Sequence, residues 1–319
     1  MHRQLSCLLS ACVLILLTDA AGAQSFPVKT IRIVTGGAGG TLDISGRLMA
    51  QALTPILGQS VIVENRPTGV PAVEAVTKAA PDGHTLLLIG ASLWLTPLVQ
   101  DVPYDPLKDL APISLTAASP NLVAVHPSLP AKSVQQIIAL AKSRPKELNY
   151  ATSGTGTANH LAVELFMAMA GGIQMVRVNY RGPAAAMNDV LSGQVHMMFA
   201  SVSAAMPHVQ AGRLRALAVT SPKRSAMAPG MPTVAESGLP GYEAETANGL
   251  YAPAKTPAAV VLRVHQEVAQ VLNRVDIKDK LFAAGVSVVA SSPDELAAAM
   301  RSEMARMGKV IRDAGIRAE

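Results

Sequence analysis

The pattern of apolar and polar positions changes character within residues 31–47, IRIVTGGAGGTLDISGR. Residues 31–34 are rich in β-branched side chains and are typical of a buried strand. After Thr41, apolar residues recur at helical spacing, at Ile44, Leu48, Met49, Ala52 and Leu53. The glycine-rich loop at 36–40 lets a ligand approach the backbone. A helix that starts after bare backbone offers unpaired N–H groups and the positive end of its dipole, which predicts an anion site.

The alternation of strands and helices extends over the rest of the chain. Apolar runs predict strands at 60–64, 85–89, 122–125, 148–152, 176–178, 195–199, 214–220 and 286–289. Helices are predicted at 71–80, 133–144, 204–210, 257–274, 277–284 and 292–314, with irregular connections at 102–110 and 222–240. The order strand, helix, strand at this spacing indicates parallel βαβ units and therefore an α/β fold.

The opening pattern returns once, in the second half of the chain. The predicted strand at 148–152 leads into Ser153-Gly154-Thr155-Gly156-Thr157, and a helix follows with Leu161, Leu165 and Met169 on one face. Ligands of α/β sheets bind at the carboxyl ends of the strands, where both loops fall. Two such loops across a cleft would hold two ends of a small anion or a dicarboxylate. Hydrogen bonds to a charged acceptor contribute about 1.5–3 kcal/mol each, so several give micromolar affinity without any catalytic group.

The N-terminus has the composition of a targeting segment. Arg3 precedes an apolar run over 5–17, and Ala21-Gly22-Ala23 is a small-residue cleavage site. The run is shorter than the roughly 20 residues that span a membrane, and a lipoprotein site at Cys12 ranks below ordinary cleavage. We therefore expect residues 1–23 to be a signal peptide, cut after Ala23, and the mature protein to be periplasmic.

Composition narrows the function classes further. Both cysteines, Cys7 and Cys12, lie in the segment to be removed, which excludes cysteine catalysis, Cys-based zinc sites and disulfides in the mature chain. Aromatic residues make up only 3% of the sequence, and the net charge of +5 is scattered. Nucleic-acid binding needs a basic stripe or stacking rings, so it is not expected. Scattered positive charge instead suits the attraction of a small acidic ligand.

The sequence does not contain the complete motif of a dinucleotide site, a serine hydrolase or a metal site. A dinucleotide site with Glu64 on the ribose would need a third glycine, but Leu42 stands there, and no G-x-x-x-x-G-K-[ST] occurs. An exported hydrolase could use Ser153 and His160. However, there is no G-x-S-x-G elbow, and no carboxylate lies at a spacing that identifies it as the residue orienting His160. The histidines also lack the spacing of metal ligands, so neither metal nor cofactor is expected. Asp43 is either a ligand contact or an acid that favours the helix dipole, and both interpretations stay open.

Taken in order, a set of motifs resembles the tripartite tricarboxylate transporter substrate-binding proteins, also called Bug receptors. The motifs are FPVKTIRIV at 26–34, GGTLD at 39–43, GQSVIVENR at 58–66, PDGHTLL at 81–87, YDP at 104–106, NYA at 149–151, HL at 160–161, YRGP at 180–183, GRLRALAVT at 212–220 and PTVAE at 232–236. The resemblance covers nearly the whole mature chain. It implies a type II periplasmic-binding-protein fold, in which two α/β domains enclose a ligand cleft and are joined by two crossovers.

We expect domain 1 to comprise residues 24–126 and 249–319, and domain 2 residues 127–248. The resemblance also implies a non-catalytic, monomeric receptor that captures a small organic carboxylate through backbone N–H groups, hydroxyls and ordered waters. Its partner would be a two-component membrane permease or, alternatively, a membrane sensor. The sequence does not distinguish the two, because transport and sensing need the same closure of the cleft. The residues expected at the ligand are Gly36, Gly37, Ala38, Gly39, Gly40, Thr41, Asp43, Ser92, Ser153, Gly154, Thr155, Gly156, Thr157, His160, Tyr180, Gly182 and Ala200.

Two departures from the family pattern bear on the identity of the ligand. The first loop lacks the Pro-Phe that usually opens it and has Thr35-Gly36-Gly37 instead. Many members carry an aspartate after the Met-Met-Phe strand, where this chain has Ala200. Loss of an acid there removes a partner for a ligand ammonium group and disfavours an amino-acid ligand.

Overall fold

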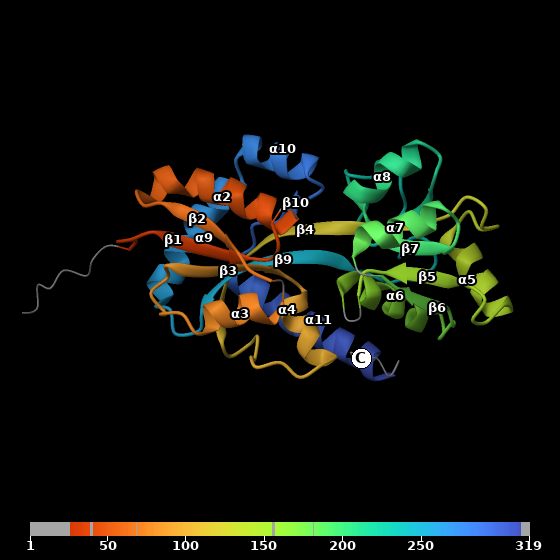
Figure 1. Ribbon diagram of the computed structural model, residues 1–319, viewed down its shortest axis with the longest axis horizontal. Helices are drawn as coiled ribbons and strands as arrows, with labels where there is room; N and C mark the ends of the chain where they lie inside the picture. The colour runs from red at the N-terminus through yellow and green to blue at the C-terminus, as the bar shows by residue number, and fades with distance from the viewer. Residues whose placement is uncertain (1–25, 39–40, 68, 155–156, 181, 314–319) are drawn as a thin grey trace, which may run out of the picture.

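Strands and helices alternate along the chain in a computed structural model that describes residues 26–38, 41–67, 69–154, 157–180 and 182–313 (Figure 1). The signal peptide predicted at 1–23, with its cut after Ala23, lies outside the described residues. The same holds for four of the expected ligand contacts, Gly39, Gly40, Thr155 and Gly156.

The first group of elements is a parallel sheet covered on both faces. Strand β1 (Ile31–Thr35) pairs in parallel with β2 (Val61–Asn65) and with β3 (Thr85–Gly90). One face carries α2 (Thr41–Leu57), α9 (Ala258–Leu272) and α10 (Val275–Ala283), and the other carries α3 (Val70–Thr77), α4 (Ser92–Leu95) and the short η1 (Thr96–Leu98). Burial on both faces explains why β3 is an unbroken apolar run.

The second group repeats this architecture. Strand β5 (Asn149–Thr152) pairs in parallel with β6 (Val176–Asn179) and with β7 (Met197–Ser201). Helices α5 (Val134–Ser143) and α6 (Ala158–Met169) pack on one face, while α7 (Pro183–Leu191) and α8 (Val202–Gln210) lie above β7 on the other (Figure 1). Strand β8 (Arg215–Val219) pairs antiparallel with the last residues of β4, on the edge of β4 opposite β7.

Two long antiparallel strands join the groups. Strand β4 (Leu110–Val125) pairs with β9 (Glu245–Pro253) over its first part and with β7 over its last residues. The strand order is therefore β2-β1-β3-β9-β4-β7-β5-β6, with β10 (Ser287–Val288) also on β4. The sequence predicted only the end of β4, because prolines and hydroxyl residues interrupt its apolar pattern. The structure accommodates Pro112 at a register shift in the pairing with β9.

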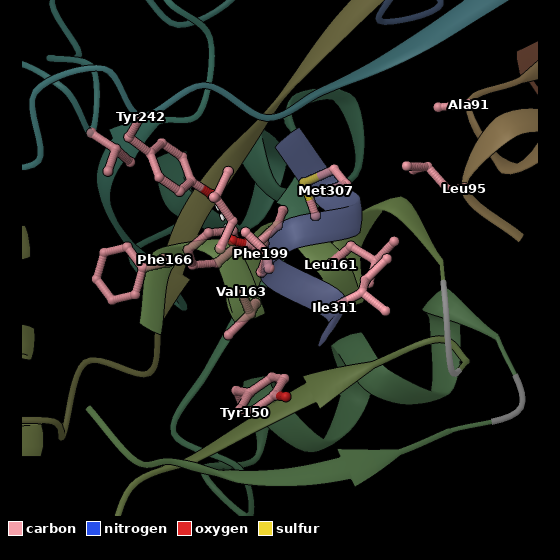
Figure 2. Packing of buried hydrophobic residues seen from close by; sticks show 14 of the residues in the cluster. Ala91, Leu95, Tyr150, Leu161, Val163, Phe166, Phe199, Tyr242, Met307 and Ile311 are labelled. Atoms are coloured by element: carbon pink, nitrogen blue, oxygen red, sulfur yellow. Dashed lines mark hydrogen bonds between the residues drawn. The ribbon is translucent and has the colours of Figure 1, made fainter. Parts of the chain in front are cut away.

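Helix α11 (Pro293–Asp313) connects the cores of the two groups. Figure 2 shows Met307 and Ile311 of this helix beside Leu161 of α6, and the same buried cluster continues to Trp94 of α4 and Val73 of α3. The α/β class expected from the sequence is confirmed. The domain limits at 126 and 249 stay a prediction. In the described part of the chain, no helix has the combination of length and apolar character needed to cross a membrane.

Partial burial of an acid on α11, Glu303, makes the stability of the fold depend on pH. Burial raises the pKa of Glu303, and the indole of Trp94, which donates to its Oε2 over 2.8 Å, opposes that rise together with the charge of Arg306. The neighbouring carboxylate of Glu243 raises the pKa further. The pKa of Glu303 is therefore higher in the folded than in the unfolded state. Its contribution to the free energy of unfolding is present at low pH and is lost as the pH rises through the folded-state pKa.

We expect Glu303→Gln to increase the melting temperature at pH 8 by a few degrees and to change it little at pH 4, because the amide keeps the acceptor for Trp94 without the buried charge. Thermal unfolding followed by circular dichroism at both pH values measures the difference. Glu295→Gln is the matched control with the opposite sign. Hydrogen bonds from Ser292 lower the pKa of Glu295, so its replacement should reduce stability at pH 8. Equal shifts for both variants at pH 8 would refute this account.

Candidate functional site

A cavity of about 410 Å³ lies where the two parallel groups of strands face each other across β4 and β9. The turn between β1 and α2 forms one wall and contributes Gly36, Gly37 and Thr41. The turn after β3 adds Ser92 at the start of α4. These residues follow the carboxyl ends of β1 and β3, which is the expected place for a ligand in an α/β sheet.

The opposite wall comes from the second group of elements. Thr157 lies at the start of α6, where its Oγ1 accepts the His160 N–H over 3.3 Å and donates to the Gly154 carbonyl over 2.9 Å. Ser201 and Ser203, at the junction of β7 and α8, complete this wall. Five of the expected residues thus line one cavity, namely Gly36, Gly37, Thr41, Ser92 and Thr157. That they bind the ligand stays a prediction.

The floor of the cavity was not anticipated from the sequence. Ser119 of β4 and Thr246 and Asn248 of β9 face into the cavity, and Asn248 is buried. The signal that could have identified Thr246 and Asn248 is the presence of polar residues at alternate positions of a strand, because such residues point to one face of β9. The sequence predicts no strand over 245–253, where residue 249 is used only as a domain limit, so this pattern is not recognised there.

The cavity is closed on one side by direct contact between its walls. Gly285, in the turn after α10, has a φ of +81°, and its carbonyl accepts from Ser119 Oγ over 2.9 Å. A Cβ atom at Gly285 would lie 2.4 Å from the Cβ of Ser203 on α8. Glycine is therefore the residue that permits both the backbone conformation and the close approach of the two walls.

Asp43 is linked to the glycine turn through the side chain of Asn65. Its carboxylate is buried and accepts from Arg47 Nε over 3.1 Å and from Asn65 Nδ2 over 2.9 Å. The same Asn65 amide donates to the Gly36 carbonyl over 2.8 Å, and its oxygen accepts from Arg47 over 2.9 Å. These described contacts link α2, the end of β2 and the turn, and both interpretations of Asp43, as a ligand contact or as an acid that favours the helix dipole, stay predictions.

His160 is in the first turn of α6 and belongs to a polar network. It is buried, and its Nε2 is 3.4 Å from Glu164 Oε1 and 3.3 Å from Arg177 Nη1. The Tyr150 hydroxyl also donates to Glu164, at 2.5 Å. The described contacts of the ring therefore connect it to β5 and β6, and none of them involves Ser153.

The other expected residues lie around the second wall. Burial and a 2.6 Å hydrogen bond to Asp189 raise the pKa of Tyr180 to about 12, so its hydroxyl stays a proton donor. Gly182 has a φ of +113° and precedes α7. Ala200 is buried and lines a neighbouring cavity between α7, α8 and the end of β7. Gly154 accepts from Thr157, Ser153 is half-buried beside it, and Ala38 is exposed in the first turn.

The described lining of the cavity is neutral. It offers hydroxyls, one amide and backbone, without a carboxylate, an imidazole or a cation among the residues that the structure describes. Nor do His, Cys, Asp and Glu residues within those ranges form a group able to hold a metal ion. Such a lining is suited to reversible binding.

The fold and this cleft define a two-domain periplasmic-binding-protein-like receptor of type II, as expected. A family profile described as "Tripartite tricarboxylate transporter family receptor" matches residues 46–316, and the chain belongs to that family. Its members are periplasmic solute-binding receptors, so the expectation of a binding protein rather than an enzyme is confirmed and the hydrolase hypothesis is rejected.

Relatives and solved structures agree with this assignment. Protein BugT of Bordetella pertussis is 33% identical over 299 residues, which cover 92% of this chain and 91% of BugT. An R. palustris protein solved with adipate is 34% identical with a TM-score of 0.79, and the match covers 92% of this chain and 100% of that one. MatC from Rhodopseudomonas palustris, solved with bound malate, is 28% identical with a TM-score of 0.74, covering 90% and 100%.

We expect Asn65→Ala to lower the free energy of unfolding by about 1–3 kcal/mol, because it leaves the Gly36 carbonyl and the buried Asp43 carboxylate each without one donor. Urea denaturation measures this loss, and hydrogen exchange should show faster opening of the amides at 36–38. Asn273→Ala, which removes an exposed side-chain bond to Ala269, is the control and should change stability by no more than about 0.5 kcal/mol. Unchanged exchange at 36–38 would argue against a role of Asn65 in holding the turn.

Proposed function

We propose that the protein captures a small organic carboxylate in this cavity and delivers it to a tripartite tricarboxylate-type permease. The observation that carries the proposal is the neutral, hydroxyl-rich lining at the starts of α2, α4 and α6, which offers donors to an anion and no described carboxylate to repel it. The adipate and malate in two structures of relatives support the same ligand class. Removal of residues 1–23 in the periplasm belongs to this proposal.

Closure of the cleft would couple binding to delivery. We take residues 24–126 with 249–319 as one domain and 127–248 as the other, so that β4 and β9 form the hinge. A ligand gripped by both walls stabilises the closed form by its additional contacts there. Four to six hydrogen bonds to a charged acceptor are sufficient for micromolar binding after association costs.

The mature protein, residues 24–319, should show raised melting temperatures with at least some members of a carboxylate panel that includes adipate, malate, succinate and hexanoate. A ligand at a thousand times its Kd stabilises the fold by about 4 kcal/mol. Glucose, a neutral dipeptide and sulfate serve as controls. Stabilisation by the sugar or the dipeptide, without any shift from the carboxylates, would refute the proposal. Delivery is tested by measuring the uptake of the identified acid in radiolabelled form. Cells that lack the protein should lose the uptake that cells with the protein show.

We expect Gly285→Ala to weaken carboxylate binding at least tenfold, because the added methyl group collides with Ser203 and holds the walls apart. Isothermal titration with the most stabilising acid of the panel measures the Kd. The control is Gly241→Ala, since Gly241 has a φ of +80° and no atom within 4 Å of the added Cβ. Both variants carry the strain of a positive φ, so only the steric effect differs. Equal affinities would show that the contact does not limit closure.

A further inference from the structure

A second cavity, of about 380 Å³, lies between α7, α8 and the end of β7 and adjoins the cleft. It is open to solvent at Pro183, Ala184 and Ala204, which are exposed, whereas Met187, Met198 and Ala200 are buried. Ser201 lines both cavities. Their linings also continue along the chain from Ala158 to Asn159 on α6 and from Ser203 to Ala204 on α8. A ligand held in the cleft therefore has an adjoining space behind Ser201. We name this second cavity the tail chamber.

The lining of the tail chamber differs in chemistry from that of the cleft. Its larger part is apolar and comprises Pro183, Ala184, Met187, Met198, Ala200 and Ala204. The described lining contains no Asp, Glu, Lys or Arg. Methionine side chains adapt to differently shaped apolar ligands, and Met187 and Met198 are both buried.

The polar groups of the chamber offer little to a second charged group of a ligand. Asn159, Asn188 and His208 complete the lining, and His208 Nδ1 is 2.6 Å from the Arg213 guanidinium. A carboxylate placed against the buried Met187, Met198 and Ala200 would lose part of its hydration without gaining an ion pair with a described lining residue. A hydrocarbon segment would gain free energy from the same transfer.

The size and the lining of the chamber are those of a ligand pocket. Ligand pockets occupy roughly 300–1,000 Å³ and are mostly apolar with a few polar groups, and the tail chamber agrees with both features. Alanines at 184, 200 and 204 keep the space open, because α7, β7 and α8 each present a short side chain to it.

We propose that the tail chamber receives the hydrocarbon part of a ligand whose carboxylate is held in the cleft. This inference rests on the proposed function and narrows its ligand class to carboxylates with an uninterrupted apolar chain, in preference to short hydroxy acids. Each methylene group buried in the chamber should lower the Kd roughly fourfold, until the chamber is filled.

Titration of the mature protein with propionate, butyrate, hexanoate and malate tests the inference. We expect the Kd to fall progressively from propionate to hexanoate, and malate to bind more weakly than hexanoate. Ala204→Leu should weaken hexanoate binding at least tenfold and leave propionate nearly unchanged, since only the longer acid needs the chamber. Ala185→Leu makes the same substitution at an exposed position of α7 outside the described lining, and should leave both affinities as they are.

Ala184→Leu fills the chamber from α7 and provides a second variant if Ala204→Leu fails to fold, which circular dichroism will show. Binding of all four acids without dependence on chain length, or a preference for malate, overturns the tail chamber and leaves the proposed function intact. Absence of binding by any carboxylate overturns both. An equal loss for propionate and hexanoate in both filling variants also contradicts the inference.

Discussion

The antiparallel pairing of β4 with β9 is the constraint on which the rest of the structure depends. Both strands lie between the two parallel groups, and successive side chains of a strand point to opposite faces. Thr246 and Asn248 of β9 consequently face the cleft, whereas Glu245 and Ala247 face the side of α11. One strand pair thus provides the floor of the binding site and the surface against which the connecting helix packs. A one-residue change of register would exchange the two.

The connections between the walls of the cleft differ on its two sides. Behind β4 and β9, α11 joins the buried residues of both groups into one cluster, with Met307 and Ile311 against α6 (Figure 2). At the cleft itself, the walls meet through Gly285 and Ser203, a contact without a bulky side chain. Extensive apolar burial resists separation more than a contact between small residues does. Movement of the walls is therefore expected to open the cleft while the packing around α11 persists.

The sequence predicted those parts of the structure that depend on local order. Glycines after a β-branched run, and Thr157 before a helical pattern, are signals within a few residues, and both turns line the cavity. Ser119 and Asn248 could not be found in this way, because their place follows from strand pairing between distant segments, and Pro112 and Pro120 obscure β4. Asp43 shows the same limit. Its type and position suit a ligand contact or a dipole interaction, and only the structure shows that Asn65 of β2 links it to the turn.

Under the proposed function, the neutrality of the described cleft would allow the protein to hold a carboxylate and still release it. A cation in the cleft would hold a carboxylate through a charge-assisted ion pair, which must be broken on release. Backbone N–H groups and hydroxyls form weaker contacts and regain hydrogen bonds with water when the cleft opens, so release of the ligand costs less free energy. The same lining discriminates weakly among carboxylates, since each presents similar oxygen acceptors. Selectivity must then come from the remainder of the ligand. The tail chamber next to Ser201 would then select among carboxylates, because the lining changes there from hydroxyls to methionine and alanine.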